Sequence, residues 1–230
     1  SNIINTGSDE ECLAIAIDSN DNLYCAGKSE SSLSGNGNLG GEDAFVMKFS
    51  PSGELLWLNQ FGDSGNEVCN DLVIDSNDKI YCVGTTNSNF TENPGGYPHE
   101  DTTDIMVVKI NSSGIFEWQK QFGKESEILA EIVTSAGNEE GLGIDLTSDG
   151  NIVASGFTSG GFFNAGAGGN DALILKIDSS NGDLIWASQF GGPLNDQCNS
   201  VAVDSNDYVY CGGFSDGSFA SLVTATNATG

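Results

Sequence analysis

A chain of 230 residues with 31 glycines, 4 prolines and 9% aromatic residues has the composition of a turn-rich globular protein. Its 33 acidic residues outnumber 7 basic ones, all of them lysine, and the net charge is −26. Such a charge repels phosphate backbones and anionic membrane surfaces, which argues against nucleic acid as a partner. No apolar run approaches the roughly 18 residues that a membrane span needs, and residues 1–12 lack the features of a signal peptide.

An internal repeat organises nearly the whole chain. Residues 12–27, CLAIAIDSNDNLYCAG, return as residues 69–84 and 198–213, and a diverged copy occupies residues 141–156. Repeats of this length indicate that one supersecondary unit is stacked several times. The approximate units are residues 7–62, 63–123, 124–191 and 192–230.

Each unit contains two predicted hairpins. In the first unit, apolar residues 13–17 turn at 18–21 and return through residues 23–26. Residues 44–49 then turn at Ser50-Pro51-Ser52-Gly53 and return through residues 55–61. Four strands per unit, without helical periodicity, predict an all-β protein: a β-propeller of about four four-stranded antiparallel blades, either complete or part of a larger propeller.

Six cysteines occupy matching positions in three units, and the two cysteines of each unit are 13 residues apart. In the diverged unit both positions change together, to Gly141 and Ala154, which indicates that the cysteines are paired. The predicted disulfides are Cys12–Cys25, Cys69–Cys82 and Cys198–Cys211.

Hairpin geometry supports this pairing. If Cys12 lies opposite Cys25, the turn falls at residues 19–20 and both sulfurs lie on one face of the hairpin. Disulfides place the protein outside the cytosol, at the cell surface or in the extracellular space; the alternative is six buried thiols in a reducing compartment. Zinc suits the spacing poorly, because the chain has one histidine, His99.

Three motifs of the repeat resemble those of a known family. The sequence DAFVMKF at 43–49, the turn FGDSGNE at 61–67 and the hairpin IDSNDNLYCAG at 17–27 resemble the SBBP-type beta-propeller repeat of bacterial exported and surface proteins. The similarity extends from about residue 7 to 214. A looser similarity links the SGELLW element at 52–57 to quinoprotein-like propellers. The chain differs from the first family in its cysteines and in showing about four units where the family name implies seven blades.

The number of blades leaves two alternatives. In one, residues 3–4 complete the last blade of a small four-bladed ring, with residues 221–226 as its third strand. In the other, which we favour, the units belong to a longer propeller, because residues 221–226 lack the Asp and Lys found in the other third strands.

An acidic residue stands just before the first strand of every unit. Since that strand lines the central channel of a propeller, one carboxylate per blade would form a ring that suits Ca²⁺ or another hard cation. The alternative is that these groups cap loop N–H groups. The four residues are Glu10, Glu67, Glu139 and Asp196.

Other repeated residues are expected to serve the fold. The turns that begin at Asp18, Asp75 and Asp204 are hairpin turns without the downstream acid of a calcium loop. The tryptophans are expected to pack between blades. The lysines are expected to pair with nearby aspartates. The tryptophans are Trp57, Trp118 and Trp186. The lysines are Lys48, Lys109 and Lys176, and their expected partners are Asp43, Asp104 and Asp171.

Function is therefore expected in the unrepeated segments. No catalytic motif surrounds His99, which lies alone in a Pro/Gly-rich loop. We expect a non-enzymatic extracellular or cell-surface module for adhesion, for glycan or protein contact, or for an appendage, with self-assembly as a further option. The alternative is an enzyme or quinone-cofactor propeller whose active residues lie in other blades. The candidate contact loops are residues 29–42, 87–103 and 124–137.

Overall fold

The computed structural model describes residues 7–33, 38–89, 102–123, 137–162 and 168–217. These residues form fourteen β-strands, and none of them lies in a helix that is long and apolar enough to cross a membrane. The strands are β1 (Glu10–Ile17), β2 (Leu23–Ser29), β3 (Asp43–Phe49), β4 (Leu55–Phe61), β5 (Glu67–Ile74), β6 (Ile80–Thr86), β7 (Asp104–Ile110), β8 (Phe116–Phe122), β9 (Glu139–Leu146), β10 (Ile152–Thr158), β11 (Asp171–Ile177), β12 (Leu184–Phe190), β13 (Asp196–Val203) and β14 (Val209–Ser215).

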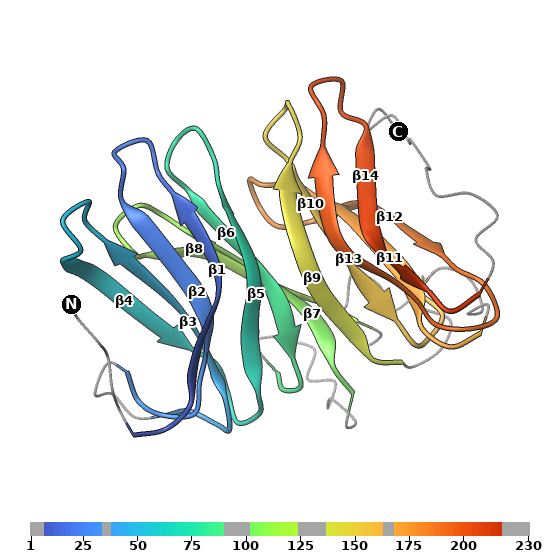
Figure 1. The fold of residues 1–230 in the computed structure, drawn as a ribbon, viewed down its shortest axis with the longest axis horizontal. Coiled ribbons are helices and arrows are strands. Elements are labelled where there is room, and N and C mark those ends of the chain that lie inside the picture. The colour runs from blue at the N-terminus through green and yellow to red at the C-terminus, as the bar shows by residue number, and fades with distance from the viewer. Residues whose placement is uncertain (1–6, 34–37, 90–101, 124–136, 163–167, 218–230) are drawn as a thin grey trace.

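The strands form four separate antiparallel sheets. β1–β4, β5–β8 and β9–β12 are four-stranded meanders in chain order, and β13 and β14 form a two-stranded sheet. The sheets stand side by side like propeller blades, with the first and the last at opposite ends (Figure 1). The predicted all-β blade architecture is confirmed, and the described sheets do not close into a ring. The segments 3–4 and 221–226, on which a four-bladed ring would depend, lie outside the described residues.

The hydrophobic core lies between the blades. One cluster joins the first and second sheets, another joins the second and third, and a smaller one joins the third and fourth. On β7, Met106 and Val108 belong to the first cluster, whereas Ile105 and Val107 belong to the second. Successive side chains of a strand point to opposite faces of its sheet. A strand in a blade that is packed between two other blades must therefore be apolar throughout. This explains the apolar runs in the middle of each repeat.

The tryptophans fasten neighbouring blades, as predicted. Trp57 in the first sheet donates its indole N–H to the carbonyl of Ser112 in the second, at 3.2 Å. Trp118 makes the same contact with Ser179 of the third sheet, at 3.1 Å. Both rings also pack against the interblade clusters, so these aromatic residues have a structural role.

Every first strand contains a β-bulge at the same place. Cys12 lies opposite Gly27, and the pairing resumes with Ala14 opposite Ala26, so that Ile15 faces Cys25. The predicted register, with Cys12 opposite Cys25, is therefore wrong. The difference comes from the turn: Asp18 to Asn22 separate the strands where a turn at residues 19–20 was expected, so Ile17 lies opposite Leu23. The bulge acts in the opposite sense and takes back one residue of that shift at Cys12.

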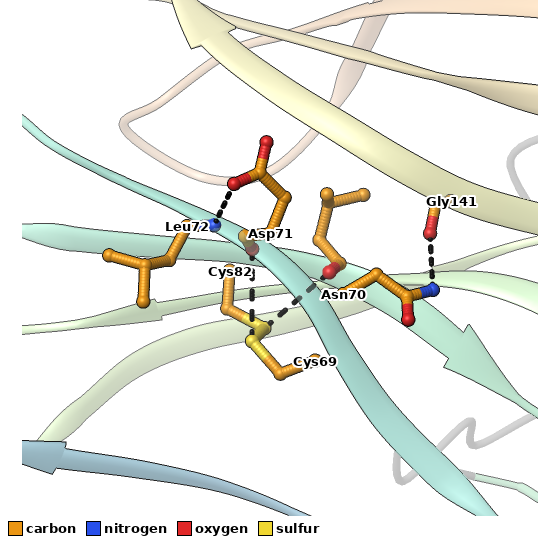
Figure 2. Close-up of a disulfide and its surroundings, with 7 residues drawn as sticks. Cys69, Asn70, Asp71, Leu72, Cys82 and Gly141 are labelled. Carbon is orange, nitrogen blue, oxygen red and sulfur yellow. Dashed lines mark hydrogen bonds between the residues drawn. A yellow bond between two sulfur atoms is a disulfide. The ribbon is translucent and has the colours of Figure 1, made fainter. Parts of the chain in front are cut away.

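The disulfides form across this bulge, with the predicted pairing. Their Cα atoms are 5.8, 5.9 and 5.6 Å apart, a separation that the bond requires. The third blade keeps the bulge without a disulfide. A Cβ on Gly141 would lie 2.7 Å from the carbonyl oxygen of Gly84 in the neighbouring blade, so a cysteine does not fit there. Figure 2 shows Gly141 close to Asn70, which donates a hydrogen bond to its carbonyl at 2.8 Å.

The glycine that closes each repeat is required by the same bulge. A Cβ at Gly84 would lie 1.7 Å from the carbonyl oxygen of Val68, and one at Gly27 would lie 1.8 Å from that of Glu11. Gly156 and Gly213 have equivalent contacts. The carbonyl before each bulge therefore occupies the space of a side chain, and only glycine fits opposite it.

Candidate functional site

The repeated lysines belong to clusters at the hairpin turns. Lys48 Nζ lies 3.0 Å from Asp18 Oδ2 and 5.0 Å from the centre of the Tyr24 ring. Asp18 also accepts hydrogen bonds from the backbone N–H groups of Asn20 and Asn22, both at 2.9 Å, as expected for a hairpin turn. These contacts hold the turn against the strand beside it.

The predicted pairing of these lysines with the third-strand aspartates is wrong. Asp43 begins β3 and Lys48 stands five residues further along it, which separates the two by about 16 Å in an extended strand. In the second and third blades the lysines pair instead with Glu117 and Asp149, at 3.2 and 3.4 Å.

Neutralising Asp18 is expected to destabilise the protein in a pH-dependent way. Burial would raise the pKa of Asp18, but hydrogen bonds from Asn22 and Lys48 outweigh it and hold that pKa well below its usual range. The carboxylate therefore contributes stability that is fully present above about pH 4 and is lost as the pH falls below that value. Asp18→Asn should cost about 2 kcal/mol at pH 7, and its deficit against the wild type should shrink in urea melts at lower pH.

Asp204 offers the matched control for this substitution. It accepts the same turn hydrogen bonds, from the N–H groups of Asn206 and Tyr208 at 2.8 and 2.9 Å, but it is only half-buried, whereas Asp18 is buried. Asp204→Asn should therefore cost much less. Equal losses for Asp18→Asn and Asp204→Asn would contradict the role of the buried Lys48 ion pair.

The acidic residues that begin the first strands lie at the junctions between blades. Glu67, Glu139 and Asp196 are buried there, whereas Glu10, in the first described blade, is half-buried. A threonine hydroxyl of the same blade donates to two of them, Thr86 to Glu67 at 2.7 Å and Thr158 to Glu139 at 2.6 Å. These side chains are therefore oriented by their own sheet toward the preceding blade.

Loop capping, the alternative stated above, is part of their role. Glu67 Oε2 accepts the N–H of Asp63 at 2.8 Å, and Asp196 Oδ2 accepts the N–H of Gly192 at 2.5 Å. In both cases the capped loop connects one blade to the next. Each carboxylate thus helps to set the junction geometry.

A second buried carboxylate meets the first at every junction. Asp43, Asp104 and Asp171 begin the third strands of the preceding blades and are buried. In each blade a fourth-strand glutamine donates its side-chain N–H to that aspartate, at 2.9, 2.8 and 2.7 Å. The glutamines are Gln60, Gln121 and Gln189.

A glycine lets the two carboxylates approach. A Cβ on Gly62 would lie 2.7 Å from Asp43 Oδ1 and 2.4 Å from Glu67 Oε2. At the third junction, a Cβ on Gly191 would lie 2.3 Å from Asp171 Oδ1 and 2.9 Å from Asp196 Oδ2. Any larger residue would push the acids away, so both carboxylates border one small space. We call the three sets Asp43/Glu67, Asp104/Glu139 and Asp171/Asp196 the junction acid pairs.

Burial changes the pKa of Glu139 in the second junction acid pair, Asp104/Glu139. It raises the pKa of Glu139 to about 8; the hydrogen bond from Thr158 opposes this shift and the nearby Asp104 carboxylate adds to it. Two carboxylates in one desolvated space repel each other, and the pair therefore favours uptake of positive charge.

The predicted carboxylate ring draws one residue from each of the four described sheets, namely Glu10, Glu67, Glu139 and Asp196. Within the described ranges, no group of three or more His, Cys, Asp or Glu side chains is placed to hold a metal ion. The pairing with an aspartate of the preceding blade was missed, although the repeated Gln-Phe-Gly at 60–62, 121–123 and 189–191 signals it.

The unrepeated loops are described only in part. Of the candidate segments 29–42, 87–103 and 124–137, most of the second and nearly all of the third lie outside the described residues, as does His99. In the first segment, Leu33 donates its N–H to Gln60 and Asn38 donates to the carbonyl of Gly41, at 2.7 and 2.6 Å. The start of this loop is thus anchored to its own blade.

Comparison with known families confirms the predicted resemblance. Residues 56–91 and 185–220 match the beta-propeller repeat SBBP. Each matched segment runs from the last strand of one blade into the first hairpin of the next. It therefore spans a junction, including its glutamine, its glycine and the second acid of the pair.

The chain is also similar to longer proteins. It is 25% identical over 218 residues to Regulatory protein FlaEY of Caulobacter vibrioides, and 27% identical over 121 residues to the uncharacterized WD repeat-containing protein L264 of Acanthamoeba polyphaga mimivirus. The matches cover 86% and 50% of this chain but only 22% and 8% of those proteins. A crystal structure of a Bacteroides caccae protein of unknown function matches with a TM-score of 0.43 and 13% identity, over 90% of this chain and 54% of that one.

Proposed function

We propose that this protein is an exported, non-catalytic β-propeller module that acts by contact, as a structural or adhesive element at the cell surface. Three disulfides support an oxidising environment outside the cytosol. The loops within 29–42, 87–103 and 124–137 are the proposed surfaces for protein or glycan partners, because their sequences vary where the rest of the blade repeats.

The observation that carries this proposal is an open blade face at the first sheet. Ile15 on β1 is 70% exposed, and Leu13 and Ile17 beside it are exposed too. The equivalent residues in the other blades, Leu72, Ile144 and Val201, are only 6 to 8% exposed because the preceding blade covers them. The first blade thus presents the surface through which each later blade packs on its predecessor.

The last sheet presents the complementary surface. Tyr210 on β14 is 46% exposed, whereas the equivalent Tyr24 and Tyr81 are buried against the next blade. The two open faces therefore match the two sides of a junction that the protein already forms three times. The partner that fits them is another blade of the same repeat, and end-to-end assembly would build a larger propeller or an appendage.

Sedimentation velocity tests this assembly. In a solution of this chain alone, another blade can come only from a second copy, so we expect concentration-dependent association through the end faces. Ile15→Lys places a charge in the contact and should abolish association.

Ile115→Lys is the control, since Ile115 is 63% exposed in the β7–β8 turn, away from the end faces. It should associate like the wild type. A wild-type chain that stays monomeric at all concentrations, or an Ile15→Lys variant that associates normally, would count against the proposal.

A further inference from the structure

The junction acid pairs recur with the same surroundings at three places. Each combines an aspartate from a third strand with a glutamate or aspartate from the next blade. At the junctions of Gly62 and Gly191, the two carboxylates border the same glycine. At the junction between them, the backbone N–H of Glu139 donates to the carbonyl of Thr103, the residue before Asp104, at 2.8 Å. Two buried carboxylates repel each other, so something at each of the three junctions must offset this repulsion.

Burying two carboxylates together is costly. Each ionised group loses hydration, and mutual repulsion adds to that loss in a medium of low dielectric constant. The glutamine and threonine donors described above satisfy some of the oxygens. Neutral donors orient the carboxylates without balancing their charge, so each pair still calls for a proton or a cation.

One buried oxygen at every junction accepts no hydrogen bond from the described residues. These atoms are Asp43 Oδ1, Glu139 Oε2 and Asp196 Oδ1. Buried polar atoms normally have a partner, and an orphaned carboxylate oxygen is among the most costly exceptions. The recurrence of one such oxygen beside a second carboxylate, at three separate junctions, indicates a missing ligand of positive charge.

We propose that each junction acid pair binds one calcium ion, held by Asp43 and Glu67, by Asp104 and Glu139, and by Asp171 and Asp196. Carboxylate oxygens are the preferred ligands of hard cations, and a divalent ion balances the charge of two carboxylates. Backbone carbonyls and water complete the coordination shell of calcium in sites with few side-chain ligands.

The site differs from a ring of acids around the channel. Its two acids come from adjacent blades, so each ion would clamp one blade to the next. The ion therefore stabilises only the docked arrangement of the two blades, and its binding raises the stability of the folded chain. This inference is independent of the proposed function, because the junctions exist within one chain.

Calcium binding to the EDTA-treated protein tests the inference. Equilibrium dialysis with metal analysis should find three ions per wild-type chain, with dissociation constants on the order of 10⁻⁴ to 10⁻³ M, as in extracellular modules. Glu139→Gln and Asp196→Asn should each bind two. Glutamine and asparagine keep the shape and the hydrogen-bond acceptor, so circular dichroism should report an unchanged fold.

Asp21→Asn is the matched control, because it removes one charge from an exposed hairpin turn and should leave three ions bound. The thermal midpoint of the wild type should also rise with the logarithm of the calcium concentration, a readout that does not depend on any variant. No bound calcium in the wild type at 10 mM, on the order of ten times the weakest expected dissociation constant, would overturn the inference. So would three ions retained in both junction variants, or a midpoint that responds only to pH.

Discussion

Removal of a single disulfide, in the variant Cys69→Ala/Cys82→Ala, is expected to lower the free energy of unfolding by about 3 kcal/mol. The cross-link closes a short loop, with the cysteines 13 residues apart, and its loss enlarges the conformational freedom of the unfolded chain. Both cysteines are fully buried at the first junction, so the blade cannot relax easily around the change. Urea unfolding under oxidising conditions measures the loss.

Reductant provides the control for this variant. With all cysteines reduced, the wild type loses the same cross-link, so its advantage over Cys69→Ala/Cys82→Ala should fall below about 1 kcal/mol, the share left to side-chain packing. The reduced wild type should also unfold at a lower urea concentration than the oxidised one. An unchanged unfolding midpoint on reduction would show that the disulfides do not stabilise the blades.

Gly84→Ala is expected to be the most damaging single substitution, with a loss of about 4 kcal/mol. The new Cβ would lie 1.7 Å from the carbonyl oxygen of Val68, a backbone atom that cannot move without breaking the bulge. That bulge also places Cys69 for its disulfide. Differential scanning calorimetry should show a large drop in the melting temperature of the oxidised protein.

Gly212→Ala is the corresponding control. It also replaces a glycine of a second strand, but the nearest atom to its Cβ would be 4.0 Å away. Its effect should stay within about 0.5 kcal/mol, the usual range for surface positions. If Gly84→Ala and Gly212→Ala melted at the same temperature, the close approach of the Val68 carbonyl would not be the reason for the glycine.

The strands and the disulfide pairing were predicted correctly because each depends on residues that are close together in the sequence. The strands 23–26 and 44–49 follow from apolar runs bounded by turn residues over fewer than ten positions. The pairing of Cys12 with Cys25 follows from their joint replacement in the third unit. The longer turn overturns the predicted alignment of the two cysteines, but it leaves both conclusions intact because the two strands still form one hairpin.

The sequence by itself determined the repeat, the four-stranded blade, the SBBP resemblance and the disulfide pairing, since each depends on local periodicity copied from unit to unit. Only the tertiary structure decided that Lys48 pairs with Asp18 and that Glu67 meets Asp43. The first contact depends on which end of a strand lies beside a turn. The second depends on how two blades dock. Repetition shows that a residue has a role in every blade, but a contact between blades becomes visible only when neighbouring sheets are placed side by side.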